Sequence, residues 1–224
     1  MQARLPHGWI VGILILGAVL FALLPGLDLW VSGLFFEPGR GFPANDWLVV
    51  KCVYRAVPFL TDLILYGVIA FLLITLVARH PRTDALRRPA LFLLLAALAG
   101  PVLTVNSALK NHWGRPRPVS VVEFGGAKTF QPWYQASDQC RRNCAFVSGH
   151  ASFGYWWVVF AFVFPRRARL WLFAGVMLGA AIGLTRIAQG GHFASDVFFA
   201  FYAVWYPALL VHRYFPPWPQ NPGG

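Results

Sequence analysis

Long apolar runs, each ended by a short polar segment, follow one another along the chain from residue 8 to residue 213. A bilayer core of about 30 Å needs roughly 20 apolar helical residues to cross it. Six segments approach that length: residues 8–25, 57–78, 90–110, 147–164, 170–187 and 193–213. The pattern predicts an all-α integral membrane protein, a six-helix bundle with a long outer loop at residues 111–146.

Two N-terminal segments need separate interpretation. Residues 8–25 are as apolar as a signal peptide, but they lack an Ala-x-Ala-like cleavage site and end at Pro25-Gly26, so we expect a membrane span. Residues 26–36 are too short to cross a bilayer, and we expect them to lie at its interface. No repeat or low-complexity tract follows, so residues 1–224 are predicted to form one domain.

Composition supports the membrane assignment. The chain is 58% hydrophobic and 12% charged, whereas soluble domains carry about 25% charged residues. Lys and Arg outnumber Asp and Glu by 19 to 8, which gives a net charge of +11. Nucleic-acid readers carry their basic stripes on soluble folds. We therefore expect a lipid in the bilayer as partner, no nucleic acid and no obligate protein partner.

The arginines between the spans predict the orientation of the chain. If the chain has six spans, all the arginine clusters fall on one side of the membrane. They precede the first span, follow the second and fourth spans, and follow the last. These residues are Arg4, Arg79, Arg82, Arg87, Arg88, Arg166, Arg167, Arg169 and Arg213. Basic loops are cytoplasmic. Both termini are therefore expected inside, and the loop at 111–146 is expected at the outer face of the membrane.

Three polar clusters interrupt the apolar pattern near the ends of predicted spans, where ionisable side chains are costly. Residues 110–118 read KNHWGRPRP, residues 148–150 read SGH, and residues 186–196 read RIAQGGHFASD. Counting spans places all three clusters at the outer face. The sequence therefore predicts that they form one site.

The cations of these clusters indicate a phosphate ligand. Lys110, Arg117 and Arg186 offer the point charge and planar forks that suit tetrahedral oxyanions. Ser148 and Gly149 open a predicted helix, whose free backbone N–H groups favour an anion. Each cation alone also fits contact with lipid headgroups, but their joint occurrence favours a phosphate site.

The histidines indicate phosphoryl-transfer chemistry. His192 and Asp196 are four residues apart and share one helix face. A carboxylate that accepts from Nδ1–H leaves Nε2 as a nucleophile. His150 is available as an acid for the departing alkoxide. Each histidine alone also fits a helix cap or a local hydrogen bond, and only their convergence with three cations favours catalysis.

A metal site is the competing interpretation of the same residues. His112, His150, His192 and Asp196 are possible zinc ligands. Three neighbouring cations would repel a divalent ion, and two-metal phosphatases normally supply several carboxylates. Asp196 is the single acid within the clusters, so we expect no metal and no cofactor.

The three clusters resemble the motifs of the type 2 phosphatidic acid phosphatase (PAP2) superfamily, which are K-x6-RP, PSGH and SR-x5-H-x3-D. The first motif is complete from Lys110 to Pro118. The second reads VSGH at 147–150, and the third reads TR at 185–186 before His192 and Asp196. Val147 and Thr185 stand where the family motifs have Pro and Ser. Neither change removes a group that would bind phosphate or transfer a proton.

This resemblance implies a six-helix PAP2-type bundle and a metal-independent phosphatase. His192 would attack phosphorus to form a phosphohistidine, with Asp196 orienting it, and His150 would protonate the leaving oxygen and then activate water. The phosphoryl oxygens would be held by Lys110, Arg117, Arg186, Ser148 and Gly149. A narrower resemblance, in residues 110–118, FQP at 130–132 and CRRNCAFVSGH at 140–150, is to bacterial lipid A 4′-phosphatases.

Several alternatives stay open at this point. Phosphatidylglycerophosphate, undecaprenyl pyrophosphate and phosphatidate are possible substrates in place of lipid A. A phosphotransferase that passes phosphate to another lipid would use the same motifs. A lipid or anion carrier would need the cations, but it gives no reason for the His192–Asp196 pair, and it lacks the broken-helix repeats of many transporters.

The cysteines predict one local crosslink. Cys140 and Cys144 lie four residues apart in the outer loop, on the oxidising side of the membrane. We expect a disulfide that orders the loop before Ser148. Three cysteines in total, with Cys52, are too few for a disulfide framework.

Overall fold

The computed structural model describes residues 7–78 and 80–218, and most of these residues are helical. The α-helices are α1 His7–Leu23, α2 Gly26–Gly33, α3 Leu48–Val77, α4 Pro81–Ala97, α5 Lys110–His112, α6 Gly149–Trp156, α7 Phe160–Val163, α8 Ala168–Ala188 and α9 Ala194–Tyr214. A π-helical stretch, Leu98–Leu109, joins α4 to α5. Short 3-10 turns lie at Pro43–Asp46, Pro118–Ser120, Val122–Phe124, Trp157–Val159 and Pro165–Arg167. Over the described ranges, β pairing is limited to two isolated bridges.

Four continuous helices are long and apolar enough to cross a membrane: Leu48–Val77, Thr83–His112, Pro165–Ala188 and Ala194–Tyr214. A fifth span is present if α1 and α2, which meet at a bend of 89°, count as one. The predicted all-α membrane class is confirmed. The segment expected as a span at 147–164 is instead divided into α6, a 3-10 turn and α7.

The second predicted span begins earlier than expected. We expect this span at residues 57–78, but α3 begins at Leu48 and includes Lys51 and Arg55. Both cations are exposed on the first turns of the helix, where they can reach water. These added turns bring Tyr54 to the candidate site, as described below.

Helix α6 packs in the centre of the bundle against α8 and α9. Glycines allow this close packing, because a Cβ added to Gly154 would lie 2.7 Å from Cα of Gly179 on α8. Small residues at helix contacts let backbones approach closely in membranes. The packing places the start of α6, which carries Ser148, Gly149 and His150, beside the adjoining ends of α8 and α9.

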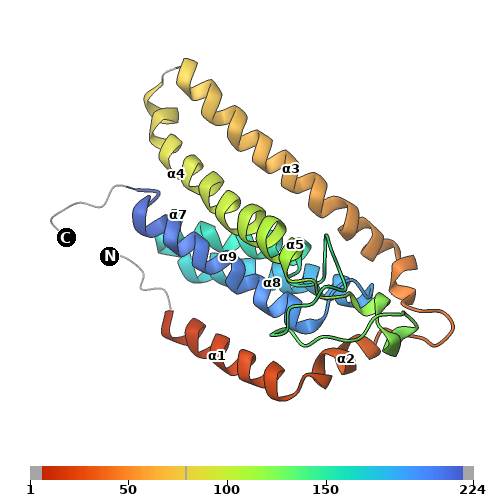
Figure 1. Ribbon diagram of the computed structural model, residues 1–224. Helices are drawn as coiled ribbons and strands as arrows, with labels where there is room; N and C mark the ends of the chain where they lie inside the picture. The colour runs from red at the N-terminus through yellow and green to blue at the C-terminus, as the bar shows by residue number, and fades with distance from the viewer. Residues whose placement is uncertain (1–6, 79, 219–224) are drawn as a thin grey trace.

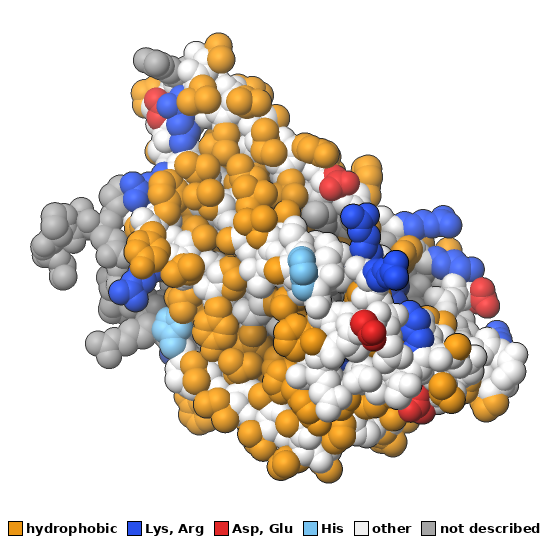
Figure 2. All heavy atoms as spheres, in the orientation of Figure 1, with side chains coloured by type: hydrophobic (Ala, Val, Ile, Leu, Met, Phe, Trp, Pro, Cys, Tyr) orange, Lys and Arg blue, Asp and Glu red, His pale blue; other side chains and the backbone are white. Residues whose placement is uncertain are grey.

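The long loop at 113–148 and helix α2 lie at one end of the bundle (Figure 1). The start of α1, the turn between α3 and α4, and the end of α9 lie at the other end. Hydrophobic side chains cover the flank between the ends, and Lys and Arg gather toward both ends (Figure 2). This distribution is typical of a protein that spans a bilayer. Arg4 and Arg79, two of the orientation signals, lie outside the described residues.

Candidate active site

Three cations converge at the loop end of the bundle. Lys110 begins α5, Arg117 follows in the loop, and Arg186 lies in the last turn of α8. Lys110 and Arg186 are buried, with 6% and 5% of their surface exposed, and Arg117 is half-buried. Lys110 interacts electrostatically with both arginines. The loop and two helices thus bring together cations that are far apart in sequence.

These cations keep donors that the protein does not use. Nζ of Lys110 makes no hydrogen bond or ion pair with the described part of the chain, and Nε of Arg186 is buried without a hydrogen-bond partner there. Nη1 of Arg186 donates to Oε1 of Gln189, and Nη2 of Arg117 donates to the Asn143 carbonyl over 2.8 Å. Buried polar groups normally find partners. The unused donors are therefore suited to an anionic ligand.

The start of α6 faces the same cations. Ser148 is the N-cap of α6, and its Oγ accepts from the Ala151 N–H over 3.4 Å. A Cβ added to Gly149 would lie 2.9 Å from Oδ1 of Asn106 and 3.5 Å from Nζ of Lys110. The bare Cα of Gly149 thus lets the lysine approach the free N–H groups of the helix.

His192 is held in one tautomer. Nδ1 lies 2.7 Å from the Ala145 carbonyl oxygen, which only accepts, so Nδ1 carries the proton and Nε2 keeps its lone pair. Burial lowers the pKa of His192 to about 3, so the ring is neutral at physiological pH. Electrostatic interactions with Lys110 and Arg186 place the ring beside the cations.

The structure corrects one expected contact. We predicted that Asp196 accepts from Nδ1 of His192, but Oδ2 of Asp196 lies 3.8 Å away, and the Ala145 carbonyl takes that place. Oδ2 instead accepts from the Phe193 N–H over 2.7 Å, at the N-terminus of α9. Asp196 therefore fixes the backbone turn next to His192 and adds a negative charge near the ring.

Arg115 anchors Asp196, and the sequence interpretation missed this role. The Arg115 guanidinium is fully buried, and its Nη1 lies 2.6 Å from Oδ1 of Asp196. Its Nη2 donates to Asp28 on α2 over 2.8 Å, and its Nε donates to the Gln131 carbonyl over 2.8 Å. Asp28 also accepts from the Ser195 N–H over 2.8 Å. One guanidinium thus joins α2, the outer loop and α9.

Two sequence signals pointed to this buried network. Arg115 lies inside the cluster at 110–118, where Lys110 and Arg117 had been assigned roles and Arg115 had not. Asp28 is a single acid in the apolar segment that follows α1. A buried charge is tolerated only when it is paired and hydrogen-bonded. An isolated acid in an apolar segment therefore indicates a buried partner of opposite charge.

Tyr54 on α3 is a second residue that the sequence did not indicate. Its ring stacks on His150, with centroids 5.0 Å apart and planes inclined by 10°. Its carbonyl accepts from Nε2 of His150 over 3.2 Å, and its ring lies 4.7 Å from the Arg186 guanidinium carbon. Tyr54 therefore orients both the predicted acid and one phosphate ligand.

A cavity of about 270 Å³ opens beside these residues, between α3, the π-helical stretch and α6. Lys110, Gly149 and His150 line one part of it, and the rest is mostly apolar, with Thr61, Asp62, Asn106 and Asn143 as polar exceptions. His192, Arg186, Arg117 and Ser148 are not part of its lining. The cavity thus reaches Lys110 and His150 among the predicted site residues.

The outer loop is closed by the predicted disulfide. Cys140 and Cys144 are bonded, which confirms the pairing, and Cys52 is a free, exposed thiol. The N–H groups of Cys144 and Ala145 then bond the carbonyls of Lys110 and Arg115 over 3.1 and 2.9 Å. The disulfide therefore lies directly before the backbone that holds His192.

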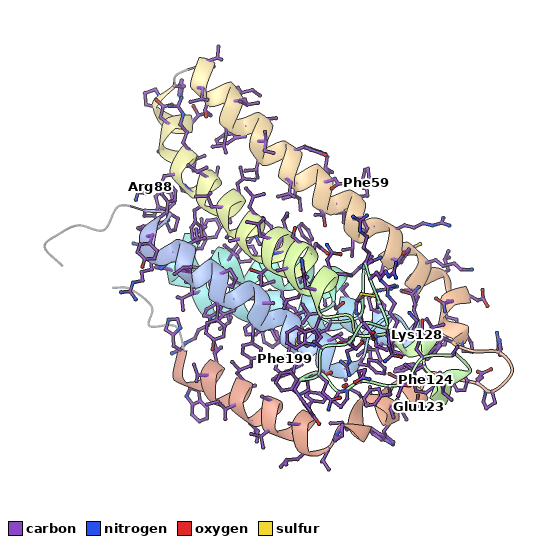
Figure 3. All side chains as sticks on the ribbon, viewed as in Figure 1. Phe59, Arg88, Glu123, Phe124, Lys128 and Phe199 are labelled. Atoms are coloured by element: carbon purple, nitrogen blue, oxygen red, sulfur yellow. A yellow bond between two sulfur atoms is a disulfide. The ribbon has the colours of Figure 1, made fainter. Side chains whose placement is uncertain are left out.

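In Figure 3, Glu123, Phe124 and Lys128 lie at this loop end and Arg88 lies at the opposite end.

Metal-ligating side chains are not gathered at this site. Within residues 7–78 and 80–218, no group of three or more His, Cys, Asp or Glu side chains is placed to hold a metal ion. The groups that do converge are cations and imidazoles.

Known proteins are similar in sequence to most of this chain. Residues 89–219 match the PAP2 superfamily. The lipid A 4′-phosphatase of Francisella tularensis subsp. novicida is 36% identical over 207 residues, which cover 87% of this chain and 90% of that protein. The lipid A 4′-phosphatases of Rhizobium etli and Rhizobium leguminosarum are 34% and 32% identical, over 85% of this chain and 78% and 86% of theirs. No solved structure matches the chain.

The family match covers the residues from α4 to the end of α9, and therefore all three polar clusters. The relatives extend the similarity over most of the chain. This chain belongs to the PAP2 superfamily.

Proposed function

We propose that this protein is a metal-independent phosphatase that hydrolyses a phosphomonoester of lipid A at the periplasmic face of a bacterial inner membrane. The observation that carries the proposal is the convergence of Lys110, Arg117 and Arg186 on two imidazoles, His150 and His192. The relatives named as lipid A 4′-phosphatases support the choice of lipid.

The reaction would proceed in two steps on this chain's own side chains. Nε2 of His192 attacks phosphorus, so a P–N bond forms as the P–O bond to the lipid breaks, and His150 donates a proton to the departing oxygen. His150 then accepts a proton from water, which attacks phosphorus and releases inorganic phosphate from His192. Splitting the transfer in this way is nucleophilic catalysis.

The cations and the start of α6 would stabilise the transferring group. Charge develops on the three equatorial oxygens of the phosphoryl group, and preorganised donors stabilise it most in a site that excludes water. Lys110, Arg117 and Arg186 supply positive charge, and Ser148 and the Gly149 N–H supply hydrogen bonds. Asp196 positions the turn that carries His192, and it touches no substrate atom in this mechanism.

Activity is expected to survive chelation, because cations of the protein itself balance the phosphate charge. Phosphate release from lipid A is measured with and without EDTA, and after addition of vanadate, which adopts the five-coordinate shape of the transferring group. EDTA should leave the rate unchanged and vanadate should inhibit. A rate that is lost with EDTA and restored by zinc or magnesium would refute the metal-free mechanism.

The proposed location requires six segments that cross the membrane, with α1 as the first and α6–α7 as the fourth. We also propose that the chain forms one domain, because the Asp28–Arg115 contact ties α2 to the rest of the protein. If the loop at 113–148 is external, a cysteine in it is accessible from outside the cell. We therefore expect Glu123→Cys, made in a Cys52→Ser background, to react with a membrane-impermeant maleimide in intact spheroplasts. Glu123 is exposed, so its replacement leaves the core unchanged. Reaction only after lysis would invert the orientation.

The substrate is tested with the purified full chain in detergent and a panel of lipid phosphates. The panel contains lipid A, phosphatidate, phosphatidylglycerophosphate and undecaprenyl pyrophosphate. We expect phosphate release with the highest kcat/KM on lipid A, and mass spectrometry should find the product one phosphate lighter. A higher kcat/KM on another member would assign the protein to that lipid.

A further inference from the structure

The cavity beside the cations contains a carboxyl group that the proposed mechanism does not use. Asp62 lies near the middle of α3 and lines the cavity together with Lys110 and His150. Its side chain makes no hydrogen bond or ion pair with the described part of the chain. Ionisable groups within membrane spans are costly, and those that occur face cavities and mark ligand paths.

Asn106 supplies a second acceptor to the same cavity. Its Nδ2 donates to the Pro101 carbonyl over 2.9 Å, which leaves Oδ1 directed toward Gly149. The bond spans five residues, as the π-helical stretch requires, and neighbouring Thr104 bonds Ala99 in the same way. Such stretches are rare and concentrate at functional sites. The cavity thus has one cation, Lys110, and two acceptors, Asp62 and Asn106, in its lining.

Apart from Thr61 and Asn143, the rest of the wall is apolar, and Val57, Leu65, Pro101 and Phe153 contribute to it. Asp62 lies eight residues beyond Tyr54, whose carbonyl bonds His150, so it is about 12 Å further along the helix axis. An apolar wall suits an acyl chain. A carboxyl group and an amide oxygen suit a hydroxyl or amide N–H on that chain, because both accept hydrogen bonds.

We propose that Asp62 and Asn106 form a subsite that binds a hydroxyl or amide N–H group in the acyl part of the substrate. The subsite selects phosphorylated lipids with such donors over lipid phosphates with plain ester-linked chains. A site built to bond a substrate hydroxyl rejects the analogue that lacks it, because its own polar groups then stay unpaired. The inference rests on the proposed lipid phosphatase function and names the part of the lipid that the cavity recognises.

The test uses two phosphatidates that differ only in a hydroxyl group on the third carbon of each acyl chain. Phosphate release is measured for the unmodified protein, Asp62→Leu, Asp62→Asn and Glu123→Gln, with Glu123 as a charge-matched control outside the cavity lining. Binding of both lipids is measured in parallel by native mass spectrometry. A binding preference is then visible even if neither lipid is hydrolysed, so failure of this inference and failure of the proposed function are distinguishable.

The unmodified protein and Glu123→Gln are expected to prefer the hydroxylated lipid by about tenfold or more, the range of a hydrogen bond to a charged group. Asp62→Leu should lose this preference, and Asp62→Asn should retain part of it through its amide oxygen. Turnover of the plain lipid at or above that of the unmodified protein shows that the variants are folded, because this lipid makes no hydrogen bond to Asp62. No preference in the unmodified protein, or an undiminished preference in Asp62→Leu, would overturn the inference.

Discussion

His192→Ala is expected to abolish phosphoenzyme formation from every substrate, whereas in His150→Ala phosphoenzyme formation should fail only where the leaving group needs a proton. His192 provides Nε2 as the nucleophile, so its loss removes the covalent route regardless of the leaving group. General acid catalysis is worth about 10²–10⁴-fold. Formation of the phosphoenzyme by His150→Ala should therefore fall by that factor with lipid A, and far less with p-nitrophenyl phosphate.

The measurement is rapid-quench labelling of the protein, because His150 also activates water in the second step. His112→Ala is the matched control: His112 belongs to the first polar cluster, but it is exposed, and its ring bonds the Ala108 carbonyl over 2.8 Å. This control should label and turn over like the unmodified protein. If p-nitrophenyl phosphate, which has the better leaving group, changed phosphoenzyme labelling equally in His192→Ala and His150→Ala, their roles would be wrongly assigned.

Arg115→Lys is expected to lower kcat by about 10²-fold with little change in KM, because small misplacements of a reacting group cost that much. A lysine keeps the charge, but it cannot contact Asp28, Asp196 and the Gln131 carbonyl at once as the guanidinium fork does. The turn that carries His192 then loses its anchor, while the cations that bind phosphate are untouched.

Kinetics and thermal unfolding of Arg115→Lys and Arg115→Ala are compared with those of Arg141→Lys, an exposed position in the same loop. Removing one partner of a buried ion pair costs about 3–5 kcal/mol, so Arg115→Ala should also unfold at lower temperature. Arg141→Lys should change neither measurement. A kcat for Arg115→Lys equal to that of the unmodified protein would rule out a positioning role.

The sequence predicted the site well where chemistry and spacing combine. Ionisable residues in an apolar chain are costly, so Lys110, Arg186 and His192 were conspicuous. The structure places them together at the end of the bundle that was expected from the count of apolar segments. The helical class and the Cys140–Cys144 disulfide were also predictable.

Contacts made by backbone and by remote segments were not predictable. The Ala145 carbonyl holds His192 through a loop whose path depends on tertiary packing, and residue type gives no signal for it. Asp28 and Tyr54 reach the site from the two N-terminal helices that border it, α2 and α3. The break in the helix at 147–164 was hidden because residues 155–164, which contain the 3-10 turn, are uniformly apolar and show no helical period.

The central claim is that His192 becomes phosphorylated by a lipid substrate. It is tested most directly by incubating the His150→Ala protein with lipid A labelled at its phosphate, quenching under alkaline conditions that preserve phosphohistidine, and mapping the label by mass spectrometry. We predict label on the peptide that contains His192, and none in the protein that also carries His192→Ala. Label on another residue, or undiminished label in the double variant, would contradict the account.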